Sequence, residues 1–242
     1  MTLTVGSLFS GIGGFDLGLE RAGMKVIWQS EIDTFASRVL KKHWPDVPNL
    51  GDITKVDWNK VERPDIICGG YPCQPFSTAG KRSGENDPRH LWPAMHNAIR
   101  VLRPRYALME NVRGHLSLGF SRVLGDLAEI GYDAEWQIIS AAAVGAPHKR
   151  DRVFIVAYAA SKYGNGRKNK FVYSKQSETT SKFRNCNRPH LVINNDWLLE
   201  PNVGRVANGI PDRVDRLKGL GNAIVPQVAE LVGALVVEHS QN

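Results

Sequence analysis

Short apolar runs alternate along the chain with stretches in which apolar residues recur every three or four positions. The short runs predict strands, and the longer periodic stretches predict helices. The predicted strands cover residues 3–9, 25–29, 65–68, 106–109 and 153–158. The predicted helices lie within 15–22, 35–40, 123–130 and 224–236, and a further helix ends at 99–102. Strands that alternate with helices indicate an α/β fold: an open, mostly parallel sheet with helices on both faces.

Residues suited to ligand binding follow four of the predicted strands. The glycine-rich stretch 11–14 follows the first strand, Glu31 the second, Cys73 the third and Glu110 the fourth. Ligands of parallel sheets bind beyond the carboxyl ends of the strands. We therefore expect these four loops to meet at one edge of the sheet.

Composition narrows the class of protein. The 242 residues are 42% hydrophobic, which is enough for a packed core, and the formal net charge is +7. A basic chain favours an anionic partner, with nucleic acid ahead of an anionic membrane. Three cysteines are too few for a disulfide framework, no charged leader precedes an apolar signal stretch, and no apolar run approaches the ~20 residues of a membrane span. We expect a reduced, cytoplasmic protein without a membrane partner or a metal site.

The positive charge is concentrated in one window, residues 161–190. Eight cations stand there against one anion, and the rest of the chain balances 23 against 23. The window is rich in Asn, Ser and Thr and poor in aliphatic residues, which indicates a loop-rich lobe set into a neutral core domain. A solvated surface loop is the alternative. The predicted division is a core at 1–158, a small basic lobe at 159–218 and a returning C-terminal segment at 219–242.

The glycine-rich stretch at 11–14 lets the backbone approach a bound nucleotide closely, and Glu31 can bind ribose hydroxyls. The spacing is not a complete G-x-G-x-x-G, because Asp16 occupies the position of the last glycine. A nucleoside cofactor without phosphates is therefore favoured over a dinucleotide. By itself this signal is weak.

Cys73 lies in a loop between two prolines and is the candidate nucleophile, although its thiol requires activation to the thiolate. An ordinary half-buried cysteine is the alternative. Cys68 lies inside a predicted apolar strand, where a structural role is favoured, and Cys186 has no recognisable setting.

Glu110 follows a buried strand, where a carboxyl group has a raised pKa and can donate a hydrogen bond to a ring nitrogen. Arg150 and Arg152 alternate before the next strand, so both guanidinium groups are expected on one face. They can orient Glu110, a ribose or a phosphate. Salt bridges at the surface are the alternative for all three residues.

The chain resembles the DNA cytosine-5 methyltransferase family, in its short bacterial or phage form, over residues 8–158 and again over about 219–227. Seven matching stretches occur in the family's order: 9–14 (FSGIGG), 30–33 (SEID), 51–53 (GDI), 70–77 (GYPCQPFS), 109–112 (MENV), 148–152 (HKRDR) and 221–225 (GNAIV). Any one of these matches is weak, but seven in order are specific. His148 departs from the family's glutamine, and 203–217 preserves little of the segment that precedes the last motif.

The resemblance implies a Rossmann-like sheet and S-adenosyl-L-methionine as the methyl donor. Glu31 would bind the ribose, Asp52 the exocyclic amine, and the glycine turn would approach the methionine part. The full set of implied cofactor contacts is Phe9, Ser10, Gly11, Ile12, Gly13, Gly14, Glu31, Ile32, Asp52, Ile53, Pro72, Asn222 and Ala223.

The resemblance also implies the reaction, methyl transfer to carbon 5 of a cytosine flipped out of duplex DNA. Cys73 would be the nucleophile, Glu110 would bind ring nitrogen 3, and Arg150 and Arg152 would hold the base and Glu110. The basic lobe would be a target-recognition lobe, and the implied DNA contacts are Gln74, Ser77, Lys168, Lys170 and Lys182. We expect a monomer, and a cognate restriction endonuclease as partner stays open.

Three rival functions remain. The same chemistry on RNA, such as tRNA, is the nearest. A DNA-binding relative without turnover is disfavoured because Cys73, Glu110, Arg150 and Arg152 are all present. A nicotinamide-dependent oxidoreductase is disfavoured by the incomplete glycine spacing.

Overall fold

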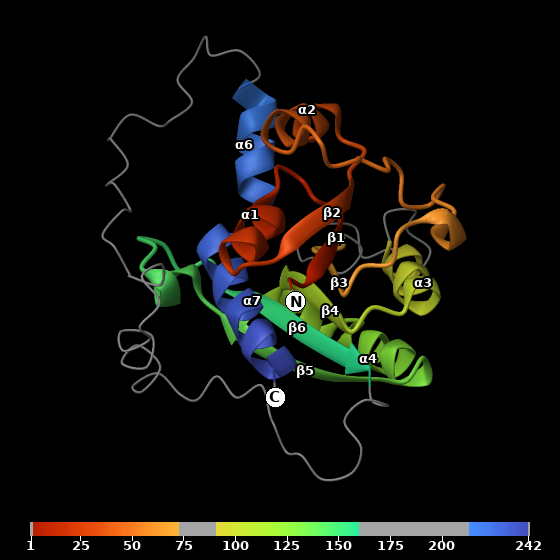
Figure 1. Cartoon of the computed structure of the whole chain (residues 1–242). Coiled ribbons are helices and arrows are strands. Elements are labelled where there is room, and N and C mark those ends of the chain that lie inside the picture. Colours follow the sequence, from red (N-terminus) through yellow and green to blue (C-terminus); the bar gives the residue numbers. More distant parts are fainter. Residues whose placement is uncertain (1, 73–90, 160–212, 242) are drawn as a thin grey trace.

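The computed structural model describes residues 2–72, 91–159 and 213–241 (Figure 1). All the predicted strands and helices are present in these ranges. The α-helices are α1 (Gly14–Arg21), α2 (Thr34–His43), α3 (Trp92–Leu102), α4 (Phe120–Glu129), α6 (Arg213–Asn222) and α7 (Pro226–Gln241). The strands are β1 (Thr4–Leu8), β2 (Lys25–Ser30), β3 (Ile66–Gly69), β4 (Tyr106–Val112), β5 (Tyr132–Ile139) and β6 (Arg152–Ala159). Short 3-10 turns are η1 (Trp58–Lys60), η4 (Arg113–Ser117) and η5 (Ala141–Val144).

The strands form one mostly parallel sheet, as the pattern predicts. Its order is β2-β1-β3-β4-β6-β5. The first four strands of this order are mutually parallel, so their carboxyl ends lie at one edge. The loops after β1, β2, β3 and β4 therefore meet at this edge.

The other end of the sheet is antiparallel. β6 pairs antiparallel with β4, and β5 pairs antiparallel with β6. β5 was not predicted, although its residues alternate between apolar and polar side chains from Tyr132 to Ile138, which is typical of a half-buried strand. The antiparallel pairing places the beginning of β6, with Arg152 opposite Val112, at the same edge as the end of β4.

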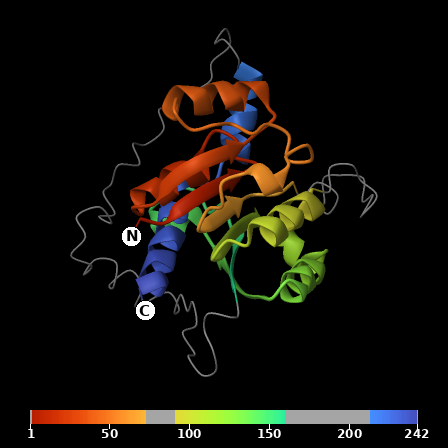
Figure 2. The same cartoon turned by 45° about the vertical axis from the view of Figure 1, so that its right-hand side comes forward.

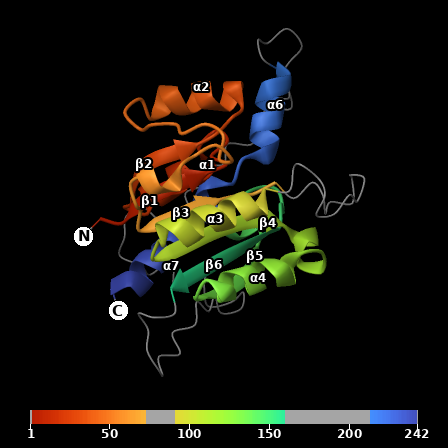
Figure 3. The same cartoon turned by 90° about the vertical axis from the view of Figure 1, so that its right-hand side faces the viewer.

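Two apolar cores cover the two faces of the sheet. One core packs α3, α4 and η1 against one face, and includes Trp28, Trp58, Trp92 and Leu127. The other packs α1 and α7 against the opposite face, around residues such as Leu19 and Val232. Figures 1 and 3 show α3 and α4 on the side of the sheet away from α1 and α7. Helices thus cover both faces, as predicted.

The C-terminal part returns to the sheet through two helices. α6 lies beside α2 at one end of the molecule, and α7 packs against α1 (Figures 1 and 2). Residues 214–241 are long and apolar enough for a membrane span, but the helical structure is interrupted between the end of α6 at Asn222 and the start of α7 at Pro226. Gly18 and Gly233 let α1 and α7 approach closely, since a Cβ at Gly18 would lie 2.5 Å from the Cβ of Ala229. α7 is therefore a core helix of this fold. The domain boundary predicted after residue 218 falls within α6.

Candidate active site

A cavity of about 610 Å³ opens where the parallel strands end. Its wall is formed by the loops after β1, β2 and β3, by the end of β4, by Arg150 and Arg152 just before and at the start of β6, and by α6 with the turn that follows it. Such volumes are typical of small-molecule and cofactor sites. Because β1 lies between β2 and β3, the cavity also occupies the crevice where open α/β sheets bind ligands.

Most of the predicted cofactor residues line this cavity: Phe9, Ser10, Gly11, Ile12, Gly14, Glu31, Ile32, Pro72, Asn222 and Ala223. Gly13, Asp52 and Ile53 are not part of the wall. A Cβ at Gly13 would meet the ring of Trp44, and Ile53 is buried in the core. The Asp52 carboxylate accepts hydrogen bonds from the backbone N–H and the hydroxyl of Thr54, and these bonds lower its pKa. Contacts between these three residues and a cofactor stay predictions.

The glycine turn after β1 depends on glycine for two different reasons. Gly11 and Gly13 have φ angles of 56° and 87°, in the left-handed region that other residues adopt at a cost. Gly14 begins α1 with an ordinary φ, but a Cβ there would lie 2.4 Å from the carbonyl oxygen of Ile224. The turn therefore packs directly against the C-terminal segment, and both form one wall of the cavity.

Glu31 joins this turn to the end of β2. Its carboxylate accepts the backbone N–H of Gly11 at 2.8 Å through Oε2, and that of Asp33 at 2.7 Å through Oε1. Its own backbone N–H donates to Asn49. The carboxylate is thus held in place with lone pairs left over on each oxygen. It can accept further hydrogen bonds from hydroxyl groups of a ligand.

Glu110 lies deeper in the cavity, within β4 rather than after it, because pairing with β6 extends β4 to Val112. Its Oε1 is 3.0 Å from Nε of Arg152, and both side chains are largely buried. Ion pairing with Arg152 alone would lower the pKa of the carboxyl. Burial outweighs that effect and raises the pKa of Glu110 to about 7. The carboxyl group is therefore available in both its protonated and ionised forms near neutral pH, consistent with the raised pKa that its place on a buried strand predicts.

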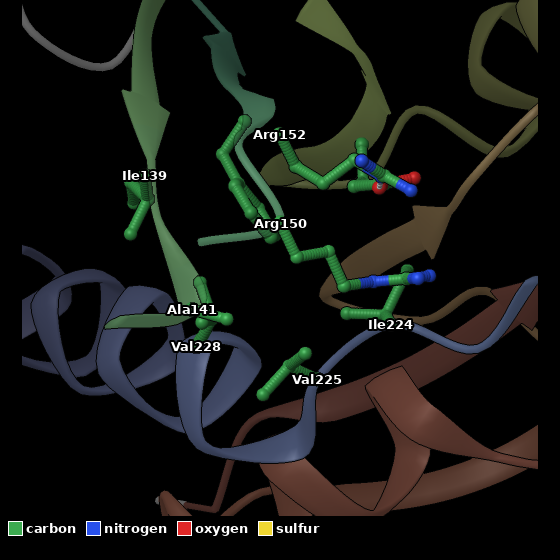
Figure 4. Close-up of a pocket in the computed structure, with 9 residues that line it drawn as sticks. Ile139, Ala141, Arg150, Arg152, Ile224, Val225 and Val228 are labelled. Atoms are coloured by element: carbon green, nitrogen blue, oxygen red, sulfur yellow. Dashed lines mark ion pairs between the residues drawn. The ribbon is translucent and has the colours of Figure 1, made fainter. Parts of the chain in front are cut away.

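Arg150 has a different set of partners. Its Nη2 donates to the carbonyl oxygens of Gly221 and Ala223, both at 2.8 Å. Figure 4 shows the side chains of Arg150 and Arg152 extending in the same direction, with the Arg150 guanidinium beside Ile224. Arg152 thus pairs with Glu110, one of the partners that the sequence suggested for both arginines, whereas Arg150 bonds to the C-terminal segment.

The chain that leads to Cys73 passes directly against Glu110. A Cβ at Gly70 would lie 3.0 Å from Oε2 of Glu110, so glycine leaves room for the carboxylate. Asn111 donates its side-chain N–H to the carbonyl oxygen of Tyr71 at 3.2 Å. The Tyr71 hydroxyl lies 2.7 Å from Nε2 of the buried His115. These contacts hold residues 70–72 beside the Glu110 carboxyl.

Several predicted site residues lie outside the described ranges: Cys73, Gln74, Ser77, Lys168, Lys170 and Lys182. Cys186 does as well. Cys68 is fully buried in β3, and burial, followed by the charge of Asp16, raises the pKa of its thiol well above the ordinary value. This setting agrees with a structural role. In the described ranges, no group of three or more His, Cys, Asp or Glu side chains is arranged to hold a metal ion.

Sequence reasoning missed Tyr71, His115 and Lys218 as site residues. Tyr71 and Asn111 stand inside quoted motifs, so their positions next to Cys73 and Glu110 were the available signal. Lys218 gave no such signal. Its Nζ lies 2.7 Å from Asp33, which attaches α6 to the start of α2 across the cavity. Asp16, at the position of the last glycine, is buried, and hydrogen bonds from Ser7 and Gln29 to its carboxylate offset part of the cost of burial.

Comparison with known proteins finds relatives among cytosine-specific DNA methyltransferases, the family that the sequence resembles. The family model for C-5 cytosine-specific DNA methylase matches residues 3–202. The type II methyltransferase M.HgiBI of Herpetosiphon aurantiacus is 37% identical over 157 residues, which are 62% of this chain and 36% of that protein. M.BsuFI of Bacillus subtilis is 35% identical over 164 residues, 64% of this chain and 39% of that protein. The chain thus spans less than half the length of these curated relatives.

Two solved structures share the fold. A putative DNA modification methyltransferase encoded within an Escherichia coli prophage has a TM-score of 0.57 at 28% identity, over 66% of this chain and 48% of that one. DNMT2 from Spodoptera frugiperda has a TM-score of 0.60 at 24% identity, over 73% of this chain and 56% of that one. These matches confirm the predicted Rossmann-like methyltransferase fold. With the family model matching most of the sequence, the chain belongs to the C-5 cytosine-specific DNA methylase family.

Proposed function

We propose that this protein transfers a methyl group from S-adenosyl-L-methionine to carbon 5 of a cytosine flipped out of duplex DNA. The observation that carries the proposal is the Glu110 carboxyl. It is buried, is paired with Arg152 at 3.0 Å, has a pKa near 7, and lies next to Gly70 in the cavity wall. A proton donor at neutral pH beside the loop of a candidate nucleophile suits addition to a pyrimidine ring.

The cavity fits the proposed cofactor in size and in the placement of its polar groups. The fixed Glu31 carboxylate suits the two hydroxyls of a ribose, and the glycine turn leaves space for a chain to pass along the backbone. The turn does not need to cradle phosphates, since this cofactor has none. When bound, S-adenosylmethionine supplies an electrophilic methyl group.

The chain's own residues then have defined tasks. The thiolate of Cys73 adds to carbon 6 of cytosine, while Glu110 donates its proton to ring nitrogen 3, and the ring electrons make carbon 5 nucleophilic. After carbon 5 has gained the methyl group, its proton passes to solvent water acting as base. The electron pair of that carbon–hydrogen bond re-forms the ring double bond and expels the Cys73 thiolate from carbon 6, while ring nitrogen 3 returns its proton to Glu110. Arg152 holds Glu110 in position throughout. Glu110 can return to its protonated form for the next turnover because its pKa lies near 7.

DNA binding is proposed from charge. The basic window at 161–190 would supply most of the phosphate contacts, through residues such as Lys168, Lys170 and Lys182, because the rest of the chain has no net charge. Gln74 and Ser77 would contact the DNA close to the flipped base. We propose that residues 159–218 form the target-recognition lobe, and that the protein acts as a monomer in the cytoplasm, alone or with a cognate restriction endonuclease.

Bisulfite sequencing of DNA from cells that express the chain tests activity and target sequence together. The proposal predicts methylation at a defined short sequence, and none in cells that express Cys73→Ser. Methylation of RNA without any of DNA would show that the chemistry is correct and the substrate is wrong. If neither nucleic acid is modified while the protein binds DNA, the chain would be a relative without turnover.

A further inference from the structure

Arg150 has an unusual backbone conformation for an arginine. Its φ of 42° lies in the left-handed region, which is sparsely populated for residues other than glycine. Such a conformation persists where surrounding contacts hold it, and it often marks a functional position. For Arg150, the two carbonyl oxygens of Gly221 and Ala223 are hydrogen-bond acceptors that hold the side chain.

These two acceptors flank Asn222, which lines the cavity. On the opposite side, the backbone of Ile224 packs against Gly14 so closely that a Cβ at Gly14 would lie 2.4 Å from its carbonyl oxygen. The turn at 221–224 is therefore clamped between the glycine turn and the Arg150 guanidinium. Figure 4 shows this guanidinium beside Ile224.

Two apolar side chains that the structure describes in the helix leading into this turn are largely exposed to solvent. In α6, Val214 is 74% exposed and Leu220 is 51% exposed. The ion pair of Lys218 with Asp33 attaches α6 to α2, but both side chains are partly exposed to solvent, where such pairs contribute little. The two hydrogen bonds from Arg150 are charge-assisted, and the one to Ala223 is partly buried, so they hold the turn that follows α6 directly.

We infer that Arg150 is a positioning residue for the cofactor site, which holds the turn at 221–223 so that Asn222 and Ala223 complete the cavity wall. Arg152 makes no hydrogen bond to this turn that the structure gives, and pairs with Glu110 instead. The two arginines thus have different roles. Arg152 orients the Glu110 carboxyl toward the base, and Arg150 holds the turn that lines the cofactor site. This inference rests on the proposed function for the identity of the cofactor.

The test compares Arg150→Met with the matched variant Arg152→Met. The first readout is amide hydrogen exchange without ligand at Ala223, whose N–H donates to the carbonyl oxygen of Gly219 at 2.9 Å. We expect exchange in 221–224 to be at least about tenfold faster in Arg150→Met and within about twofold of wild type in Arg152→Met. The second readout is the affinity for S-adenosylhomocysteine by calorimetry. We expect a loss of about 10- to 100-fold in Arg150→Met, the range for hydrogen bonds from a charged donor, and nearly none in Arg152→Met.

Unchanged exchange and unchanged affinity in Arg150→Met would overturn the inference, as would equal effects of the two variants. If Arg150→Met does not fold, Arg150→Gln carries the test, because its shorter, uncharged side chain cannot place a charged donor where Nη2 bonds to both carbonyl oxygens. Wild-type exchange and affinity in Arg150→Gln would also overturn the inference. If the wild type itself bound no S-adenosylhomocysteine, the proposed function would fail, whereas the exchange measurement would still decide the role of Arg150.

Discussion

The titration of Glu110 leads to a prediction about stability. Burial raises the pKa of this carboxyl from 4.5 to about 7, and each pKa unit corresponds to about 1.36 kcal/mol. The folded chain therefore holds the proton more tightly than the unfolded chain does. The stabilisation from this proton is fully present below pH 4.5, is lost as the pH rises toward 7, and is absent above 7. Over this window the shift amounts to about 3 kcal/mol.

Glu110→Gln isolates this effect because glutamine has a similar shape and does not titrate. We expect the free energy of unfolding of wild type, relative to Glu110→Gln, to fall by about 3 kcal/mol between pH 4.5 and pH 8. Asp16, whose pKa burial raises from 3.8 to about 6, contributes in the same direction. Its contribution is present in both proteins and cancels in the difference.

Urea unfolding followed by circular dichroism at four or more pH values gives this difference directly. A difference that does not change with pH would show that Glu110 titrates as it does in the unfolded chain. A difference that rises with pH would show that the ion pair with Arg152 outweighs burial. Either result would refute the assignment of Glu110 as a proton donor at neutral pH.

Three further predictions concern the nucleophile, the cofactor and the DNA. Cys73→Ser should abolish methyl transfer while Cys68→Ser retains most of it, and DNA containing 5-fluorocytosine should trap an adduct that mass spectrometry maps to Cys73; an adduct elsewhere would refute this. Glu31→Ala should weaken cofactor binding by about 1.5–3 kcal/mol in calorimetry, whereas Glu110→Gln should leave it nearly intact, and the reverse pattern would exchange their roles. Changing Lys168, Lys170 and Lys182 together to Gln should lower the slope of the logarithm of DNA affinity against the logarithm of salt concentration, measured by fluorescence anisotropy, by roughly two to three units, at ~0.9 per phosphate contact. An unaltered slope would show that the DNA binds to another surface of the protein.

Much of the fold follows from local sequence. Apolar periodicity located the strands and helices, because burial on one face repeats with the period of the element itself. The strand β5 shows where this reading was incomplete. Its alternation from Tyr132 to Ile138 was present in the sequence, but it lies at the edge of the sheet, where Trp136 is 50% exposed, and it lacks a continuous apolar run. α6, in which Val214 and Leu220 are exposed, gave no clear periodic signal.

The sequence by itself determined most of the elements, though not β5 or α6, as well as the family and the edge of the sheet at which Glu31 and Glu110 stand. Only the tertiary structure decided which of these residues meet. Arg150 bonds to residues 71 and 73 positions away in the chain, and Arg152 reaches Glu110 because β6 runs antiparallel to β4. Periodicity records whether a side chain is buried, whereas the partner of a polar group depends on strand order and packing between distant segments. For the same reason Asp52 and Ile53, which the resemblance grouped with Glu31, lie outside the cavity wall that Arg150 helps to build.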